Sequence, residues 1–250
     1  MPDSDPEAPA APPTDDDLGP LAPFRHGVFA MLWSTWLIAN LCMWMNDVAA
    51  AWLMTTLTST PIWVALVQTA ATLPVFLLGL PSGALADILN RKHFLFFTQV
   101  WVAVVGGLLA LAVFLQAITP PLLLLLLFLN GIGLALRWPV FSAIVPELVP
   151  RGQLPAALAL NGVSMNASRI FGPLVAGAII ASLGSAWVFL LNAVLAVGAF
   201  VLILRWQSQQ KQRSALPGER FVGAMRVGLQ HVMQSPRMRV VLVRVFMFFL

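Results

Sequence analysis

Charged side chains are scarce in this chain, at 10% of its 250 residues, whereas hydrophobic residues make up 59%. A water-soluble domain carries roughly 25% charged residues. This sequence therefore has too little charge to cover a folded domain with a polar surface, and the mean hydropathy of +0.86 supports the same conclusion. We predict an integral membrane protein.

Residues that build disulfides and metal sites are also few. A single cysteine, Cys42, excludes an intramolecular disulfide and a cysteine-based metal cluster. The three histidines (His26, His93 and His231) lie far apart in polar segments, which argues against a metal site. The sequence also contains no aspartate-rich prenyltransferase pair, no His-Glu metal motif and no nucleotide-binding loop. We expect no enzymatic activity, no metal and no cofactor, and the missing Walker sequence favours an ion gradient over ATP as an energy source.

Long apolar runs are what the chain has in abundance. A helix needs about 20 apolar residues to cross the bilayer core, and six stretches qualify, with a seventh run starting near Val240. The six stretches are 28–54, 62–84, 94–117, 121–143, 156–182 and 186–205. We predict an all-α membrane fold in which residues 24–205 form a six-helix bundle and residues 240–250 begin a truncated seventh helix.

Two polar segments flank the predicted bundle. Six of the ten acids lie in the first twenty residues, in a stretch rich in alanine and proline, so we expect 1–23 to be a disordered tail. This tail lacks the basic region of a signal peptide, and no cleavage is expected. Residues 206–239 form a cytoplasmic linker, in which apolar residues recur at helical spacing from Glu219 to Gln234. That helix either lies in the membrane interface or is an ordinary linker helix.

The basic residues indicate how the bundle is oriented. The connections after the first, third and fifth spans carry no charge, whereas the opposite ends carry Arg25, Arg91, Lys92 and Arg151, and the linker adds more bases. Cytoplasmic loops collect lysine and arginine. We predict a cytoplasmic amino terminus in a bacterial inner membrane, and attribute the basic excess to topology rather than to nucleic-acid binding.

A short polar segment separates the second and third spans. It reads Gly-Ala-Leu-Ala-Asp-Ile-Leu-Asn-Arg-Lys over residues 83–92. This spacing resembles the loop between helices 2 and 3 of the major facilitator superfamily, Gly-x-Leu-Ala-Asp-Arg-x-Gly-Arg-Arg/Lys. Ile88 and Asn90 depart from the pattern, and the matching residues are Gly83, Leu85, Asp87, Arg91 and Lys92.

A second stretch narrows the resemblance. Residues 139–161 contain Pro-Glu-Leu-Val-Pro-Arg followed by Ala-Leu-Asn, and residues 166–173 read Asn-Ala-Ser-Arg-Ile-Phe-Gly-Pro. From about Phe24 to Leu250 the chain resembles the transmembrane secretion effector branch of the superfamily, which includes enterobactin exporters. The resemblance implies one half of a twelve-helix transporter, so a missing carboxy-terminal half is expected. A free-standing half-transporter that dimerises is the alternative.

Part of the fifth span is similar to the family's antiporter motif, Gly-Pro-x-x-Gly-Gly. The corresponding residues are Gly172, Pro173, Ala176 and Gly177. Proline bends a helix and small residues allow close helix contact. The bend either shapes a cavity closed toward one side, which favours export, or produces a tightly packed helix without a directional role.

Two charges in different spans suggest proton coupling. Ionisable residues inside a bilayer usually face a cavity or a partner, and Asp47 and Arg169 lie within the first and fifth spans. An apolar cavity favours the protonated carboxyl, whereas a nearby arginine favours the carboxylate. Our hypothesis makes Asp47 the proton-responsive acid and Arg169 its partner or a contact for an anionic substrate. In the alternative, Asp47 packs against Asn46 near the outer interface.

Other polar residues are candidates for a substrate cavity. Arg137 in the fourth span either extends toward the cytoplasmic head groups or attracts an anionic substrate from within a cavity. Several amides at membrane depth either form interhelical hydrogen bonds or line the same cavity: Asn40, Gln68, Asn130 and Asn166.

The polar segment also has two interpretations. In one, Asp87 accepts hydrogen bonds from Arg91 or a helix amino terminus and locks the cytoplasmic side shut. In the other, the bases are only topology anchors.

Taken together, these features of the sequence predict a proton-coupled exporter of a small amphipathic or anionic molecule, such as a siderophore or a drug. An import facilitator of the same fold and a half-transporter that does not transport are the alternatives.

Overall fold

The computed structural model describes residues 19–88, 91–205 and 244. This part of the chain is all-α, as predicted, and no strand occurs in it. A short 3₁₀ helix, η2 (Ala22–Arg25), precedes α1, and another, η3 (Arg151–Gln153), precedes α5. The six long helices are α1 (Gly27–Leu57), α2 (Pro61–Ile88), α3 (Arg91–Phe114), α4 (Pro120–Leu148), α5 (Leu154–Leu183) and α6 (Ser185–Arg205).

Each of the six helices matches one predicted span and is long and apolar enough to cross a membrane. The uncharged connections are very short, and two of them end a helix with a left-handed residue. Gly184 (φ 93°) alone joins α5 to α6, and its N–H donates to the carbonyl of Ile179. Gln116 (φ 53°) has the same role after α3, where the N–H of Ala117 donates to the carbonyl of Ala112. Such caps satisfy the last carbonyls of a helix, and the cap after α3 ends that helix three residues before the predicted 117.

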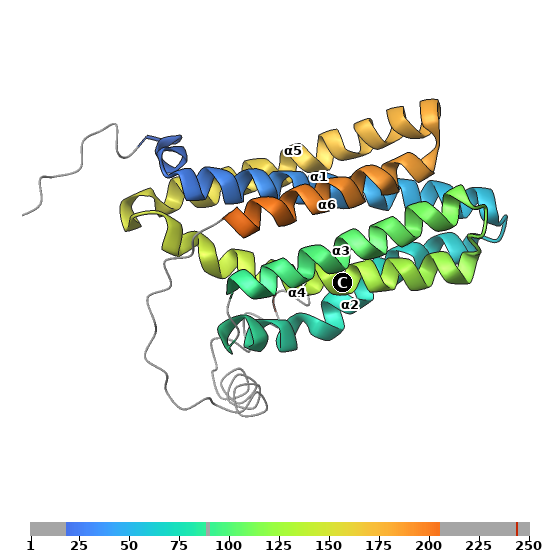
Figure 1. Cartoon of the computed structure of the whole chain (residues 1–250), viewed down its shortest axis with the longest axis horizontal. Coiled ribbons are helices and arrows are strands. Elements are labelled where there is room, and N and C mark those ends of the chain that lie inside the picture. Colours follow the sequence, from blue (N-terminus) through green and yellow to red (C-terminus); the bar gives the residue numbers. More distant parts are fainter. Residues whose placement is uncertain (1–18, 89–90, 206–243, 245–250) are drawn as a thin grey trace, which may run out of the picture.

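The helices lie side by side and alternate in direction, as Figure 1 shows. The most extensive packing joins α2 to α4, α3 to α6 and α1 to α5. Glycines permit the close approaches: a methyl group at Gly131 of α4 would lie 2.5 Å from the carbonyl oxygen of Ala71 on α2. Such contacts between small residues stabilise helix pairs in lipid.

Buried apolar residues form two clusters at different depths. One contains Met45 of α1, Leu127 of α4 and Phe189 of α6, and lies toward the α1–α2 connection. The other contains Trp36, Phe141 and other residues near the opposite end, where η2 and η3 lie. The segments of α1, α3, α4 and α6 between the two clusters carry five buried polar side chains: Asn40, Thr98, Gln99, Arg137 and Asn192. The core is therefore interrupted by a polar layer partway along the helices.

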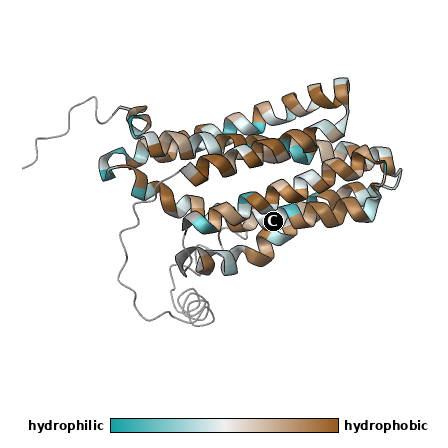
Figure 2. Ribbon diagram, in the orientation of Figure 1, coloured by the Kyte–Doolittle hydropathy of each residue, from teal (hydrophilic) through white to brown (hydrophobic). Residues whose placement is uncertain are grey.

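Hydrophobic residues predominate along the length of the helices (Figure 2), and many of them are exposed on the outside of the bundle. Large side chains such as Phe76, Phe97 and Ile170 are at least two-thirds exposed. Soluble proteins rarely expose contiguous apolar surface of this kind, so the bundle is a multi-pass membrane protein whose outer face contacts lipid. The predicted acidic tail, apart from its last residues, the linker and the seventh span lie outside the described residues, Arg244 excepted.

Candidate functional site

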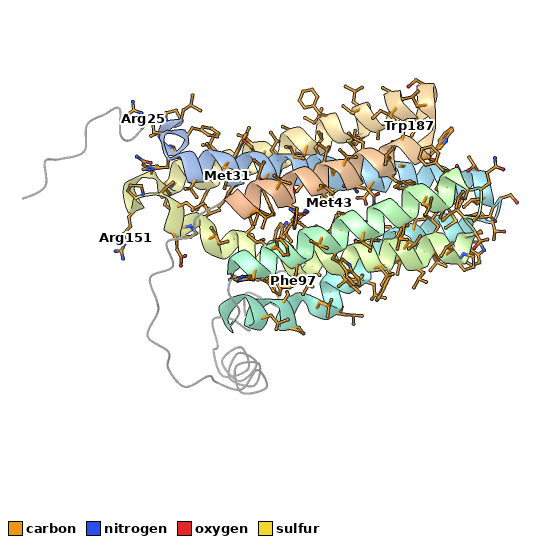
Figure 3. All side chains as sticks on the ribbon, in the orientation of Figure 1. Arg25, Met31, Met43, Phe97, Arg151 and Trp187 are labelled. Carbon is orange, nitrogen blue, oxygen red and sulfur yellow. The ribbon has the colours of Figure 1, made fainter. Side chains whose placement is uncertain are left out.

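The polar layer contains a partly open cavity of about 50 Å³, lined mainly by α1, α3, α4 and α6. Met43, one of its lining residues, lies about midway along the bundle in Figure 3. A site of this size and polarity has room for a few water molecules. Its polar lining consists of Cys42, Asn46, Asp47, Gln99, Asn130, Arg137 and Asn192.

Arg137 is the cation of this cavity. Its side chain is 7% exposed and lies inside the bundle, with the guanidinium carbon 5.9 Å from the centre of the Trp36 ring. Trp36 in turn stacks on Phe141 at a centroid distance of 4.0 Å, which fixes the ring in place. Arg137 also borders a second, smaller cavity on the side of Trp36 and Ile203. The side chain therefore faces two internal spaces rather than the membrane surface.

Several polar atoms around the cavity have no protein partner. Among the described residues, the buried Nε of Arg137 and the Oδ1 atoms of Asn46 and Asn130 make no hydrogen bond. Buried polar groups are almost always paired, with protein, water or ligand. Because Asp47, half-buried in α1, lines the same space, the cavity combines an acid, a base and unsatisfied amides. Such a set suits water or a polar ligand.

The structure does not bring Asp47 and Arg169 together. Arg169 is an exposed residue of α5, with its guanidinium carbon 5.6 Å from the centre of the Trp44 ring. It does not line the cavity, and no ion pair between it and Asp47 occurs in the described part of the chain. The cavity base that accompanies Asp47 in this conformation is Arg137, and the Asp47–Arg169 partnership stays a prediction.

The amide candidates separate into inner and outer residues. Asn130 lines the cavity, whereas Asn40, although buried, donates from Nδ2 to the Trp36 carbonyl at 2.9 Å within α1. Gln68 and Asn166 are exposed on α2 and α5. Sequence reasoning missed Gln99, a buried amide of α3 that lines both cavities. Its position inside the apolar run 94–117 was the signal that could have identified it.

The antiporter-like motif lies where α5 packs against α1. A methyl group at Gly172 would lie 2.6 Å from Cβ of Trp44 and 3.2 Å from the carbonyl oxygen of Leu41. Ala176 is fully buried, and Pro173 is inside the helix, but a methyl group at Gly177 would have no neighbour within 4 Å. Only part of the motif therefore contributes to packing within this bundle.

The 83–92 segment is mostly helical. Asp87 lies in the last turn of α2, and α3 begins with Arg91 and Lys92. Leu85 packs on the apolar cluster near η2 and η3, and a methyl group at Gly83 would have no neighbour within 4 Å. The side chains of Asp87, Arg91 and Lys92, and all of Asn90, lie outside what the structure describes.

The basic ends of the helices gather at one end of the bundle. Arg25 and Arg151 lie at the end where the described chain begins, whereas Trp187 lies at the opposite end (Figure 3). At that basic end, Nε2 of His26 and Oε1 of Gln153 are 3.0 Å apart, which joins the start of α1 to the start of α5. The separation of charge agrees with the predicted sidedness of the loops.

Comparison with known proteins identifies the family. A family model described as "Transmembrane secretion effector" matches residues 18–250. The chain is 27% identical over 221 residues to an uncharacterized MFS-type transporter of Bacillus subtilis, covering 87% of this chain and 52% of the relative. It is 25% identical to a macrolide efflux protein of Streptococcus pyogenes over 68% of this chain and 40% of the relative. It is also 25% identical to a staphyloferrin A transporter of Staphylococcus aureus, over 64% of this chain and 41% of the relative.

The matched relatives are about twice as long as the matched region or longer, so the chain spans roughly half of a transporter of this kind or less. The six apolar helices, the polar cavity inside them and the family match over most of the sequence agree with one another. This chain belongs to the transmembrane secretion effector family of the major facilitator superfamily.

Proposed function

We propose that the chain forms the first half of a twelve-helix, proton-coupled exporter of a small amphipathic or anionic molecule. The observation that carries the proposal is the cavity between the two apolar clusters, which holds Asp47, Arg137 and buried amide oxygens without partners. Ionisable residues at this depth mark substrate or ion pathways. The printed names of two relatives, a macrolide efflux protein and a staphyloferrin A transporter, suggest a drug-like or siderophore-like substrate.

In this mechanism Asp47 binds a proton from the outside and releases it to the cytoplasm. Protonation removes the negative charge of Asp47 from a cavity that also contains the Arg137 guanidinium. The net charge of the cavity therefore becomes more positive each time a proton binds. A transporter that alternates between two conformations is driven by such differential stabilisation. The second half of the molecule supplies the opposite wall of the pathway, as in other transporters built from repeats.

The orientation is part of the same proposal. The amino terminus and the end carrying Arg25 and Arg151 face the cytoplasm, and the protein resides in a bacterial inner membrane. Asp87 then lies on the cytoplasmic side, four residues before Arg91, the first residue of α3. We propose that it contributes to a charge network that keeps this side closed while the cavity opens outward.

Reversing the charge of Asp87 tests that network. We expect Asp87→Lys to lower export at least about tenfold, a change of about 1.4 kcal/mol, because a third positive charge would repel those of Arg91 and Lys92, four and five residues further along the chain. The measurement is the initial efflux rate at matched protein levels. Asp87→Glu is the control, because it keeps the negative charge. Wild-type efflux by Asp87→Lys would reduce this segment to a topology anchor.

Efflux by the full-length protein tests the function itself. Cells are loaded with a fluorescent dye, a macrolide or a siderophore, and the substrate that remains inside is followed before and after a protonophore is added. We expect expulsion of at least one probe and loss of that expulsion when the proton gradient collapses. Transport that continues unchanged and follows the substrate gradient in both directions would instead identify a facilitator.

A further inference from the structure

We propose that the cavity at Arg137 binds a small monovalent inorganic anion, the size of chloride or bromide, independently of the transported substrate. The inference rests on the interior of this one bundle and does not depend on the proposed export function. It concerns a site lined mainly by α1, α3, α4 and α6, all of them helices of this bundle.

The first step is the unmet charge of Arg137. Its side chain is 7% exposed, and no carboxylate forms an ion pair with it among the described residues. A buried cation without a partner is costly. The face of Trp36 lies on one side of the guanidinium, but a ring offers only a modest cation–π attraction. The Nε atom remains without an acceptor, so the guanidinium has a donor left for an anion.

The second step is the set of neighbouring donors. Gln99, Asn130 and Asn192 come from three different helices and line the same cavity as Arg137. Gln99 is 3% exposed and Asn192 is 6% exposed, and neither side chain hydrogen-bonds to another described residue. Each amide carries two N–H donors. A guanidinium and amide groups that can present N–H donors therefore line one cavity, and together they can bind an anion.

The third step is the size and charge of the space. A cavity of about 50 Å³ holds a few waters, and therefore also a halide ion, but it does not hold a siderophore or a macrolide. Asp47 lines the same cavity, and its carboxylate opposes the entry of a second negative charge. The site therefore favours an anion that is both small and singly charged.

The experiment measures anion-dependent stability of the full-length protein in detergent. Thermal unfolding is followed by tryptophan fluorescence while sodium gluconate is replaced by sodium chloride or bromide at constant ionic strength, which keeps screening fixed. We expect a saturable rise in Tm, roughly 5–10 °C at a halide concentration about 100 times the Kd. Gluconate, which is too large for the cavity, should give no rise.

Three variants make the assignment specific. Arg137→Gln should lose the halide-dependent rise, and Arg137→Lys, which keeps the charge, should retain it with weaker binding. Arg169→Gln is the matched control, because Arg169 also lies over a tryptophan ring but is exposed and outside the cavity; its halide response should equal that of the wild type. If Arg137→Gln does not fold, the ³⁵Cl NMR signal is titrated with wild type and Arg137→Lys, and a higher Kd for chloride in Arg137→Lys is expected; equal Kd values would overturn the proposal.

Equal Tm in chloride and gluconate for the wild type would overturn the proposal, as would an unchanged halide response in Arg137→Gln. A halide response that appears only in Asp47→Asn would also overturn it, since Asp47 would then be the natural counter-ion of Arg137. Failure of proton-driven export would leave these results unaffected, so the two proposals fail separately.

Discussion

Asp47→Asn is expected to lower proton-driven export at least about tenfold, which corresponds to about 1.4 kcal/mol in the barrier. Asparagine keeps the shape of the side chain but neither binds nor releases a proton, so the coupling step is lost while the cavity is preserved. The same change should flatten the pH dependence of the remaining transport. The measurement is the initial efflux rate across a range of external pH values, normalised to the amount of protein in the membrane.

Asp47→Glu is the control for this prediction, because it keeps a titratable carboxyl in the half-buried site. We expect it to retain pH-dependent export, at a rate reduced by its extra methylene. Wild-type export by Asp47→Asn with an unchanged pH profile would remove the proton role. Asp47 would then be a polar residue that packs beside Asn46, as the alternative interpretation of the sequence has it.

Gly172→Ala is expected to destabilise the bundle by about 1–3 kcal/mol, the usual cost of overpacking. The added methyl group would lie 2.6 Å from Cβ of Trp44 and 3.2 Å from the carbonyl oxygen of Leu41. The Leu41 oxygen is a backbone atom of α1, and Cβ of Trp44 is bonded directly to that backbone. Neither atom can move by a change of rotamer, so α5 must move away from α1 to make room. The hydrogen bonds between these helices, from Trp33 to the Leu160 carbonyl and from Ser168 to the Leu37 carbonyl, would then lengthen.

The expected result is a fall in Tm of several degrees, given roughly 2–4 °C per kcal/mol for a chain of this size. Gly177→Ala is the matched control: it lies in the same helix and motif, but its methyl group would meet nothing within 4 Å. Alanine also favours helix by up to about 1 kcal/mol over glycine, so this variant should be as stable as the wild type or more stable. Equal destabilisation by both variants would contradict the packing role assigned to Gly172.

The sequence predicts the helices well because lipid imposes a simple rule. A span must be long and apolar, and all six predicted runs form helices, although the structure extends α4 to Leu148 and ends α3 at Phe114. The end of α3 depends on a left-handed conformation at Gln116. A glutamine carries no strong signal for such a cap, whereas the glycine at 184 does.

The site was only partly predictable, for a related reason. Asp47 and Arg137 stand out as charges in apolar runs, and both line the cavity. Their neighbourhood does not follow from the sequence, because a helix in lipid is apolar on both its inner and outer faces, and hydrophobic periodicity does not reveal which face points inward. For the same reason the sequence did not reveal that Arg137 shares a cavity with Asp47, and Gln99 was overlooked.

The measurement that tests the central claim most directly is proton movement coupled to substrate. The full-length protein is reconstituted into liposomes that contain a pH-sensitive dye. A transported probe is then added outside, with no proton gradient imposed, so that the substrate gradient is the only driving force. We predict that the wild type moves protons against the direction of the substrate, and that Asp47→Asn at equal reconstitution moves none. Proton movement by Asp47→Asn equal to that of the wild type would contradict the account.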